Sequence, residues 1–163
     1  LIFLDLNMYL NQKLCFKINR NNMLTQEQKT NLTNELQSWM GTKWVHNQAC
    51  KGVGADCVQF IVKAAQNVNV LPKEYKTRKY DKDWAMHNAR SILREEISKL
   101  AEKINIKDIQ EGDVILFMTG KTSGHIGVYL GGNKVIHSHI RNGVSTVEFN
   151  NINTTIESVW RFK

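Results

Sequence analysis

The sequence predicts an α+β fold, because helical and strand patterns occupy different halves of the chain. Up to about residue 104, apolar residues recur at the three- and four-residue spacing of amphipathic helices. From Gly112 onward they form short runs separated by glycine-containing turns, which is typical of antiparallel strands. Runs of helices followed by runs of strands are characteristic of α+β proteins. We therefore expect helices packed on a small antiparallel sheet.

Length and composition are those of one globular domain. The chain has 163 residues, of which 42% are hydrophobic and 23% charged, so it can bury a core of its own. No apolar run approaches the length of a membrane span, and membrane insertion is not expected. The apolar residues 1–4 lack a basic start and a small-residue cleavage site, so no signal peptide is recognisable.

The net charge of +7 is spread along the chain. No zinc-finger or RNA-binding signature accompanies the lysines and arginines, so a nucleic-acid partner is not expected. Scattered positive charge is compatible with attraction to an anionic cell envelope, or with an ordinary solvated surface.

The first readable element is a helix that begins near Met23. Thr25 and Gln28 form a capping box, and an apolar stripe follows to a predicted end at Gly41. For residues 1–22 two interpretations are open, a hairpin or a leader foreign to the native protein. We therefore predict one domain over residues 23–163, preceded by an extension over residues 1–22.

A loop over residues 41–56 leads into the second helix, predicted over residues 57–68. Because this loop runs straight into Cys57, its side chains are expected to line any site built on that residue. A third helix is predicted from an Asp83 cap through Ile104, since apolar residues there are spaced three or four apart. Strands are predicted at 114–117, in a hairpin over 123–139, at 143–147 and at 158–162.

Cys57 is the candidate nucleophile. Asp56 is a good N-cap, and Gln59 completes a pattern like a capping box, so Cys57 falls in the first helical turn. Unpaired backbone N–H groups and the helix dipole in that turn favour an anion, which predicts a stabilised thiolate. A small buried hydrophobe is the alternative interpretation of a lone cysteine.

The three cysteines do not predict a metal site. They form no Cys-x-x-Cys pair, and the spacing of Cys50 and Cys57 matches no common zinc pattern. An odd number of cysteines leaves a free thiol. Neither a metal nor a cofactor is therefore expected.

Several stretches together resemble the NlpC-type cell-wall cysteine peptidases, with closest similarity to the branch encoded in phage tail gene clusters. The principal ones are residues 54–60 (GADCVQF), 124–131 (GHIGVYLG) and 135–137 (VIH). Residues 39–44 (WMGTKW), 80–84 (YDKDW) and 111–117 (EGDVILF) fit the same branch. The resemblance extends from about Met23 to the C-terminus. Lys43 stands where the family usually has proline, and Gln59 where a small hydroxyl residue is common.

The resemblance implies a papain-like fold, with the cysteine helix packed on the sheet. It implies a peptidase that cuts peptidoglycan stem peptides between D-glutamate and a diamino acid, through Cys57 and His125. It also implies delivery by a phage tail to the bacterial wall or periplasm, with other tail proteins as partners. Trp44, His46 and Asp56 are assigned to substrate binding. A Cys-His amidase or acyltransferase, and an inactive tail-assembly or wall-binding module, remain alternatives.

The third catalytic residue is chosen between two histidines. Alternation puts Ile126 and Val128 in the core and leaves His125 facing the cysteine helix. A three-residue loop, 131–133, would set His139 directly opposite His125 and His137 diagonally, whereas a two-residue loop would exclude both. Geometry thus slightly favours His139, and the resemblance favours His137. We predict His137 as the third residue, with a bulge near Gly131 shifting the register, and assign His139 to substrate contact.

Overall fold

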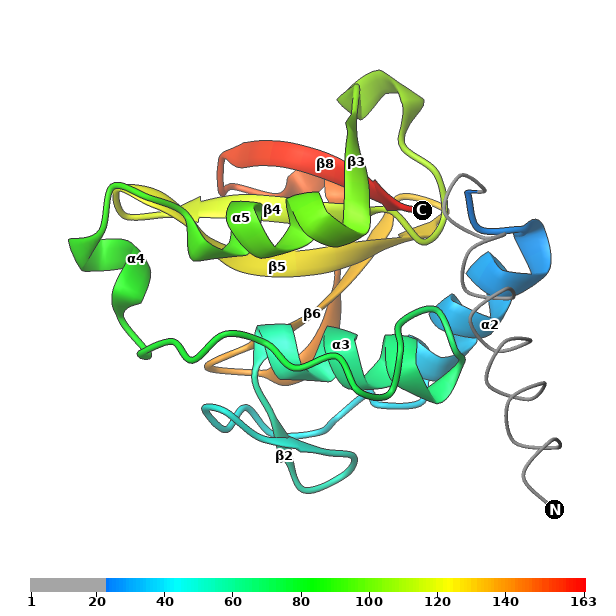
Figure 1. Ribbon diagram of the computed structural model, residues 1–163, viewed down its shortest axis with the longest axis horizontal. Coiled ribbons are helices and arrows are strands. Elements are labelled where there is room, and N and C mark those ends of the chain that lie inside the picture. The colour runs from blue at the N-terminus through cyan, green and yellow to red at the C-terminus, as the bar shows by residue number, and fades with distance from the viewer. Residues whose placement is uncertain (1–22) are drawn as a thin grey trace, which may run out of the picture.

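A six-stranded antiparallel sheet forms the body of the protein, which is represented by a computed structural model that describes residues 23–163 (Figure 1). The strand order is β3-β8-β4-β5-β6-β7, and every pair is antiparallel. The strands are β3 (Ala101–Ile104), β4 (Val114–Thr119), β5 (Thr122–Gly131), β6 (Lys134–His139), β7 (Gly143–Glu148) and β8 (Ile156–Phe162). The predicted α+β fold is confirmed.

Helices cover one face of this sheet. They are α2 (Gln26–Gln37), α3 (Cys57–Asn67), α4 (Trp84–His87) and α5 (Ile92–Leu100). The 3₁₀ turns are η1 (Ile106–Asp108) and η2 (Phe149–Asn151), and Phe149 packs on the opposite face of the sheet. Two short strands, β1 (Ala49–Cys50) and β2 (Gly54–Ala55), pair in the segment before α3. Figure 1 shows α5 in front of β4 and β5, and α3 lower in the same view.

The main core lies between the helices and the sheet. From α3 it receives Phe60, Ile61, Ala64 and Ala65, which share one face of that helix and are 3% exposed or less. The buried Trp39 ring packs edge-on against Phe60, with 5.7 Å between ring centroids. A smaller cluster around Ile115, Phe117 and Val135 fills the other face of the sheet. Burial on both faces explains why β4 is an unbroken apolar run.

The first helix begins as predicted but ends early. Thr25 and Gln28 form both hydrogen bonds of the capping box. The helix stops at Gln37 rather than at Gly41, and a turn follows. Met40 lies in that turn and is 50% exposed.

The single helix predicted from Asp83 to Ile104 is wrong. Ser91 caps a separate helix, α5, by accepting from the Arg94 N–H, and its buried hydroxyl contacts Ser123 at 2.6 Å between the two Oγ atoms. Residues 101–104 form β3, which pairs with the outer edge of β8. Asp83 precedes α4, but its side chain accepts no capping hydrogen bond. Spacing of apolar residues cannot distinguish a helix end from an edge strand whose partner is distant in sequence.

The β5–β6 hairpin combines a two-residue turn with the register expected of a three-residue loop. Gly132 and Asn133 form a tight two-residue turn, both at positive φ (54° and 62°), as such turns require. An irregularity between Tyr129 and Gly131 adds one residue to β5. The strands therefore pair as a three-residue loop would have set them, with His137 opposite Gly127.

The expectations for residues 1–22 lie outside the described residues. Within residues 23–163, no helix is long and apolar enough to cross a membrane.

Asp113 and Arg161 form a buried ion pair, and removal of one partner should destabilise the fold. Arg161 donates from Nε to Asp113 Oδ1 at 2.8 Å and from Nη2 to Oδ2 at 2.7 Å, and both residues are under 9% exposed. Arg161→Met would leave the carboxylate buried without its charge partner, so the free energy of unfolding should fall by about 3–5 kcal/mol in urea titrations. Arg94→Met, which removes the exposed pair with Glu157, is the control and should cost under about 1 kcal/mol. Equal losses in the two variants would contradict this expectation.

Candidate active site

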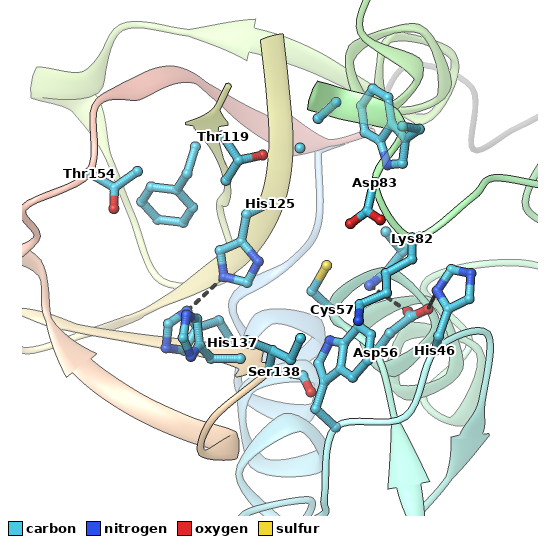
Figure 2. A pocket seen from close by; sticks show the side chains of 18 of the residues that line it. His46, Asp56, Cys57, Lys82, Asp83, Thr119, His125, His137, Ser138 and Thr154 are labelled. Atoms are coloured by element: carbon cyan, nitrogen blue, oxygen red, sulfur yellow. Dashed lines mark hydrogen bonds and ion pairs between the residues drawn. The ribbon is translucent and has the colours of Figure 1, made fainter. Parts of the chain in front are cut away.

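All the residues that the sequence assigned to a site line one cavity of about 480 Å³ (Figure 2). The loop before α3 and the start of α3 form one wall, and β4, β5 and β6 form the opposite one. Residues around α4 and from the end of β7 to Thr154 close the remaining sides. The predicted residues found there are Trp44, His46, Asp56, Cys57, His125, His137 and His139.

Three contacts distant in sequence hold the turn that presents Cys57. The Ala55 N–H donates to the Lys43 carbonyl at 2.9 Å, and the Asp56 N–H donates to the Gln48 carbonyl at 3.3 Å. Ser138 Oγ donates to the Ala55 carbonyl at 2.7 Å. Because Ser138 lies between His137 and His139 on β6, this bond ties the histidine strand to the cysteine turn.

Asp56 holds this turn together through its carboxylate. Oδ1 accepts from the Val58 and Gln59 N–H groups at 3.0 and 2.8 Å, which caps α3. Oδ2 accepts from the Asn47 N–H at 2.7 Å and from the Tyr80 hydroxyl at 2.8 Å. These protein donors occupy most of the accepting capacity of a carboxylate that is only 2% exposed. In this structure Asp56 therefore acts mainly as a positioning residue.

The capping-box interpretation of Gln59 is wrong. Its amide Nε2 donates to Thr77 Oγ1 at 2.8 Å instead of turning back to the Asp56 backbone. Gln59 therefore anchors the segment over residues 72–83, which we call the strap, against α3. Figure 1 shows the strap running along α3 towards α4.

The predicted stabilisation of the Cys57 thiolate is also corrected. Burial, and next the Asp56 carboxylate, raise the pKa of the Cys57 thiol to about 12. Hydrogen bonds from the backbone N–H groups of Ile126, Cys57 and Val58 act in the opposite direction, as a helix start should, but they are the smaller effect. The resting site therefore holds a neutral thiol.

His125 is neutral as well. Burial, followed by the neighbouring His137 and His139, lowers the pKa of His125 to about 3. Its Nε2 lies 2.8 Å from His137 Nδ1, which leaves Nδ1 as the nitrogen available to the thiol. In Figure 2 the Cys57 sulfur points into the cavity on the side where the His125 ring lies. A neutral imidazole beside a neutral thiol can accept its proton during attack on an electrophile.

His137 rather than His139 makes the hydrogen bond to His125. The ring centroids of His125 and His137 are 5.0 Å apart, against 6.1 Å for His125 and His139. His139 Nδ1 instead accepts from the Arg141 N–H at 3.3 Å. His137, which lies diagonally across from His125, therefore makes this contact. It does so in the three-residue register, for which strand geometry alone slightly favoured His139.

The face predicted for His125 needs correction. Ile126 and Val128 are buried as expected, but they belong to the same core cluster as the cysteine helix. His125 projects from the opposite face of β5, where its ring lies 5.7 Å from that of Phe117, a member of the smaller cluster. Cys57 and His125 nevertheless meet, because both line the cavity at this end of the sheet.

Sequence reasoning assigned no role to several lining residues. Tyr80 and Lys82 come from the strap, where the sequence showed only a family resemblance, and Asp83 was expected only to cap a helix. Asn151 and Thr154 lie beyond β7 and carried no recognisable signal. Gly124 precedes His125 where a Cβ would come within 2.0 Å of Thr119 Oγ1, so a glycine is required there.

Among residues 23–163, no group of three or more His, Cys, Asp or Glu side chains could hold a metal ion.

Acid should destabilise the protein through His125 and His137. Burial holds their pKa values at about 3 and about 4 in the folded state, against about 6.5 when unfolded. Above pH 6.5 both are neutral in either state and contribute nothing. As the pH falls below 6.5, these histidines bind protons in the unfolded chain but not in the folded chain, so the free energy of unfolding decreases. For His125 the loss between pH 7 and pH 5 should be on the order of 2 kcal/mol.

Urea unfolding at pH 7, 6 and 5 would measure this effect. His125→Gln should flatten the dependence of unfolding free energy on pH. His87→Gln, at an exposed histidine of α4, is the control and should leave the dependence unchanged. An identical slope in wild type and His125→Gln would show that His125 is not buried in its neutral form.

A cysteine at a helix start, placed across a cavity from histidines on an antiparallel sheet, defines a papain-like fold with a thiol–imidazole site. The chain belongs to the NlpC/P60 family, whose model matches residues 38–161. Among curated proteins it is 22% identical over 116 residues to the "Murein DD-endopeptidase MepS/Murein LD-carboxypeptidase" of Escherichia coli K12. That match covers 71% of this chain and 52% of the relative, so the chain spans about half the length of the curated relatives it matches.

Solved structures of the family share the fold. NlpC1 from Trichomonas vaginalis superposes with a TM-score of 0.62 at 18% identity, covering 83% of this chain and 44% of that one. The peptidoglycan hydrolase RipB from Mycobacterium tuberculosis gives a TM-score of 0.58 at 16% identity, covering 85% and 66%. The NlpC/p60 domain of the peptidoglycan hydrolase SagA gives 0.55 at 14% identity, covering 83% and 97%. At these identities the likeness establishes the papain-like fold.

Proposed function

We propose that the protein is a cysteine peptidase that hydrolyses an amide bond in peptidoglycan stem peptides. The observation that carries this proposal is the arrangement of Cys57, His125 and His137 at one cavity, with His125 Nε2 held by His137. Family membership supports the substrate class, since relatives are named as murein or peptidoglycan hydrolases.

The chemistry follows from the neutral resting pair. His125 Nε2 carries a proton and donates it to His137 Nδ1 in a hydrogen bond, so Nδ1 is the base. As the Cys57 sulfur bonds to the scissile carbonyl carbon, its proton passes to His125 Nδ1. The imidazolium then protonates the leaving amine, and the C–N bond breaks to leave a thioester. Water hydrolyses the thioester, with His125 accepting its proton, and the free thiol returns.

The negative charge on the carbonyl oxygen needs hydrogen-bond donors. The Cys57 N–H is one candidate, because amides in the first turn of a helix have no acceptor within the helix. A second donor is expected from the loop at residues 44–46, which borders the same cavity through Trp44 and His46.

The bond that we propose lies between D-glutamate and the diamino acid, and the proposed setting is a phage or prophage tail acting on the bacterial wall or periplasm. Both rest on the similarity of the quoted motifs to the tail-associated branch. Contacts with other tail proteins belong to the same proposal. The curated relatives bear names that specify DD-endopeptidase and LD-carboxypeptidase activities, so these bonds are the principal competitors.

Digestion of purified peptidoglycan, followed by mass spectrometry of the products, tests the proposal. Cleavage after D-glutamate would release a new amine on the diamino acid and a free γ-carboxyl on glutamate. Release of D-alanine or cleavage of cross-links would support the activities named for the relatives instead. Activity should survive EDTA, since the proposed step uses a thiol and an imidazole alone; loss on chelation and recovery with zinc would contradict it. An absence of wall products would favour an amidase, an acyltransferase or an inactive module.

A further inference from the structure

Lys82 places a positive charge in the cavity. It belongs to the strap, which Tyr75 fastens to α5 through Glu96 at 3.2 Å and which Tyr80 fastens to Asp56. The Lys82 Nζ lies 5.7 Å from the centroid of the Trp44 ring, a cation–π distance. Figure 2 shows the Lys82 side chain reaching into the cavity towards Cys57. Lys82 is exposed to solvent, and its side chain lines the same cavity as the candidate nucleophile.

This charge has no protein counterion within the described part of the chain. Lys82 forms no ion pair among residues 23–163. Asp56, which lines the same cavity, already accepts four hydrogen bonds, and the closest side chain that forms a possible ion pair with it is His46, with 3.7 Å between Nδ1 and Oδ2. Asp83 also lines the cavity but makes no ion pair with its neighbour. The cavity therefore presents an ammonium group whose charge a ligand could neutralise.

The opposite part of the cavity carries no charge. Its lining residues from the end of β7 and the following turn are Val147, Asn151, Ile152, Asn153 and Thr154. These side chains can pack against apolar groups and form neutral hydrogen bonds. The difference in charge between the two parts would orient a substrate that has an anionic group on one side of its scissile bond.

We propose that Lys82 binds a carboxylate of the substrate, on the Trp44 side of Cys57. This inference rests on the proposed function and identifies the group that the site recognises. A stem peptide of the proposed kind offers two such groups, the α-carboxylate of D-glutamate and a carboxylate of the diamino acid. The Lys82 ammonium group can pair with either carboxylate as a point charge. Converting that carboxylate to a neutral amide would leave the Lys82 charge unpaired.

Two pairs of synthetic peptides would identify the group. In the first pair the D-glutamate carboxylate is free in one peptide and amidated in the other. In the second pair the same change is made at the carboxylate of the diamino acid. Wild-type protein should prefer the free carboxylate in one pair by roughly tenfold in kcat/KM. Lys82→Met should abolish that preference by slowing the free peptide and leaving its amide unchanged. Lys79→Met, at an exposed lysine of the strap that does not line the cavity, is the matched control and should keep the preference.

Binding to the Cys57→Ala protein separates this inference from the proposed function. Calorimetry with the same peptides measures the preference without turnover. A preference for a free carboxylate that Lys82→Met removes would support the inference even if no bond were cut, in which case the proposed hydrolysis alone would fail. Equal affinity for the free and amidated members of both pairs, or an equal loss for all peptides in Lys82→Met, would overturn the inference even if wall hydrolysis were observed.

Discussion

Replacing Cys57 with alanine should lower the rate of peptidoglycan hydrolysis by a factor on the order of 10⁴ to 10⁶, the range found when an enzyme loses its nucleophile. The reason is that no other cysteine lines the cavity within the described residues. Stability should change little, because the substitution removes a single sulfur atom and the Asp56 cap of α3 remains. Release of soluble stem peptides from purified walls would measure the loss, and urea unfolding would show that the variant is folded.

Cys50→Ala is the control for this prediction. Cys50 is an exposed cysteine on β1, in the segment that precedes α3, and its replacement should leave hydrolysis unchanged. A folded Cys57→Ala protein that retains wall hydrolysis would remove the proposed mechanism. The inactive-module alternative predicts equally low activity in wild type and variant, so the wild-type rate decides between these alternatives.

Replacing His137 with alanine should lower kcat by about 10²- to 10⁴-fold, while His139→Ala should cost far less. The His137 Nδ1 atom holds His125 Nε2 at 2.8 Å, so its loss would free the His125 ring to rotate and would remove the preference for the tautomer with a basic Nδ1. The effect should fall on kcat rather than KM, because the bond acts on the base and not on the substrate. Steady-state kinetics on one defined stem peptide would measure the two parameters.

A conservative variant distinguishes orientation of the ring from packing around it. His137→Asn offers an amide oxygen close to the position of Nδ1 and should recover part of the kcat lost in His137→Ala. His139→Asn is the matched control on the same strand. If His139→Ala proved the more damaging of the two alanine variants, the positioning role would pass to His139.

Much of the site could be predicted because its signals are local. The Asp56 cap, the apolar face of α3 and the two-residue alternation of β5 each depend on residues a few positions apart. Such patterns placed Cys57 at a helix start and His125 on a strand, and the structure has both there. The resemblance added Trp44, His46 and His137, all of which reach the cavity.

Other features depended on contacts between distant parts of the chain. Residues 101–104 have helical spacing yet form a strand, because β8 offers them an edge to pair with. Lys82 lies in a stretch that resembles the family, but its place in the cavity depends on Gln59 and Tyr80, which hold the strap through Thr77 and Asp56. Neither the pairing of residues 101–104 with β8 nor the contacts of the strap can be inferred from neighbouring residues alone.

By itself, the sequence therefore determined the fold class, the position of Cys57 in the first turn of a helix, and the set of histidines on the hairpin. Tertiary structure alone decided the protonation state of the pair, since burial outweighs the helix start and raises the pKa of Cys57 while lowering that of His125. It also decided which histidine holds His125, through one extra residue in β5. The physical reason is that backbone conformation follows from neighbouring residues, whereas burial and strand register depend on what the rest of the chain places beside them.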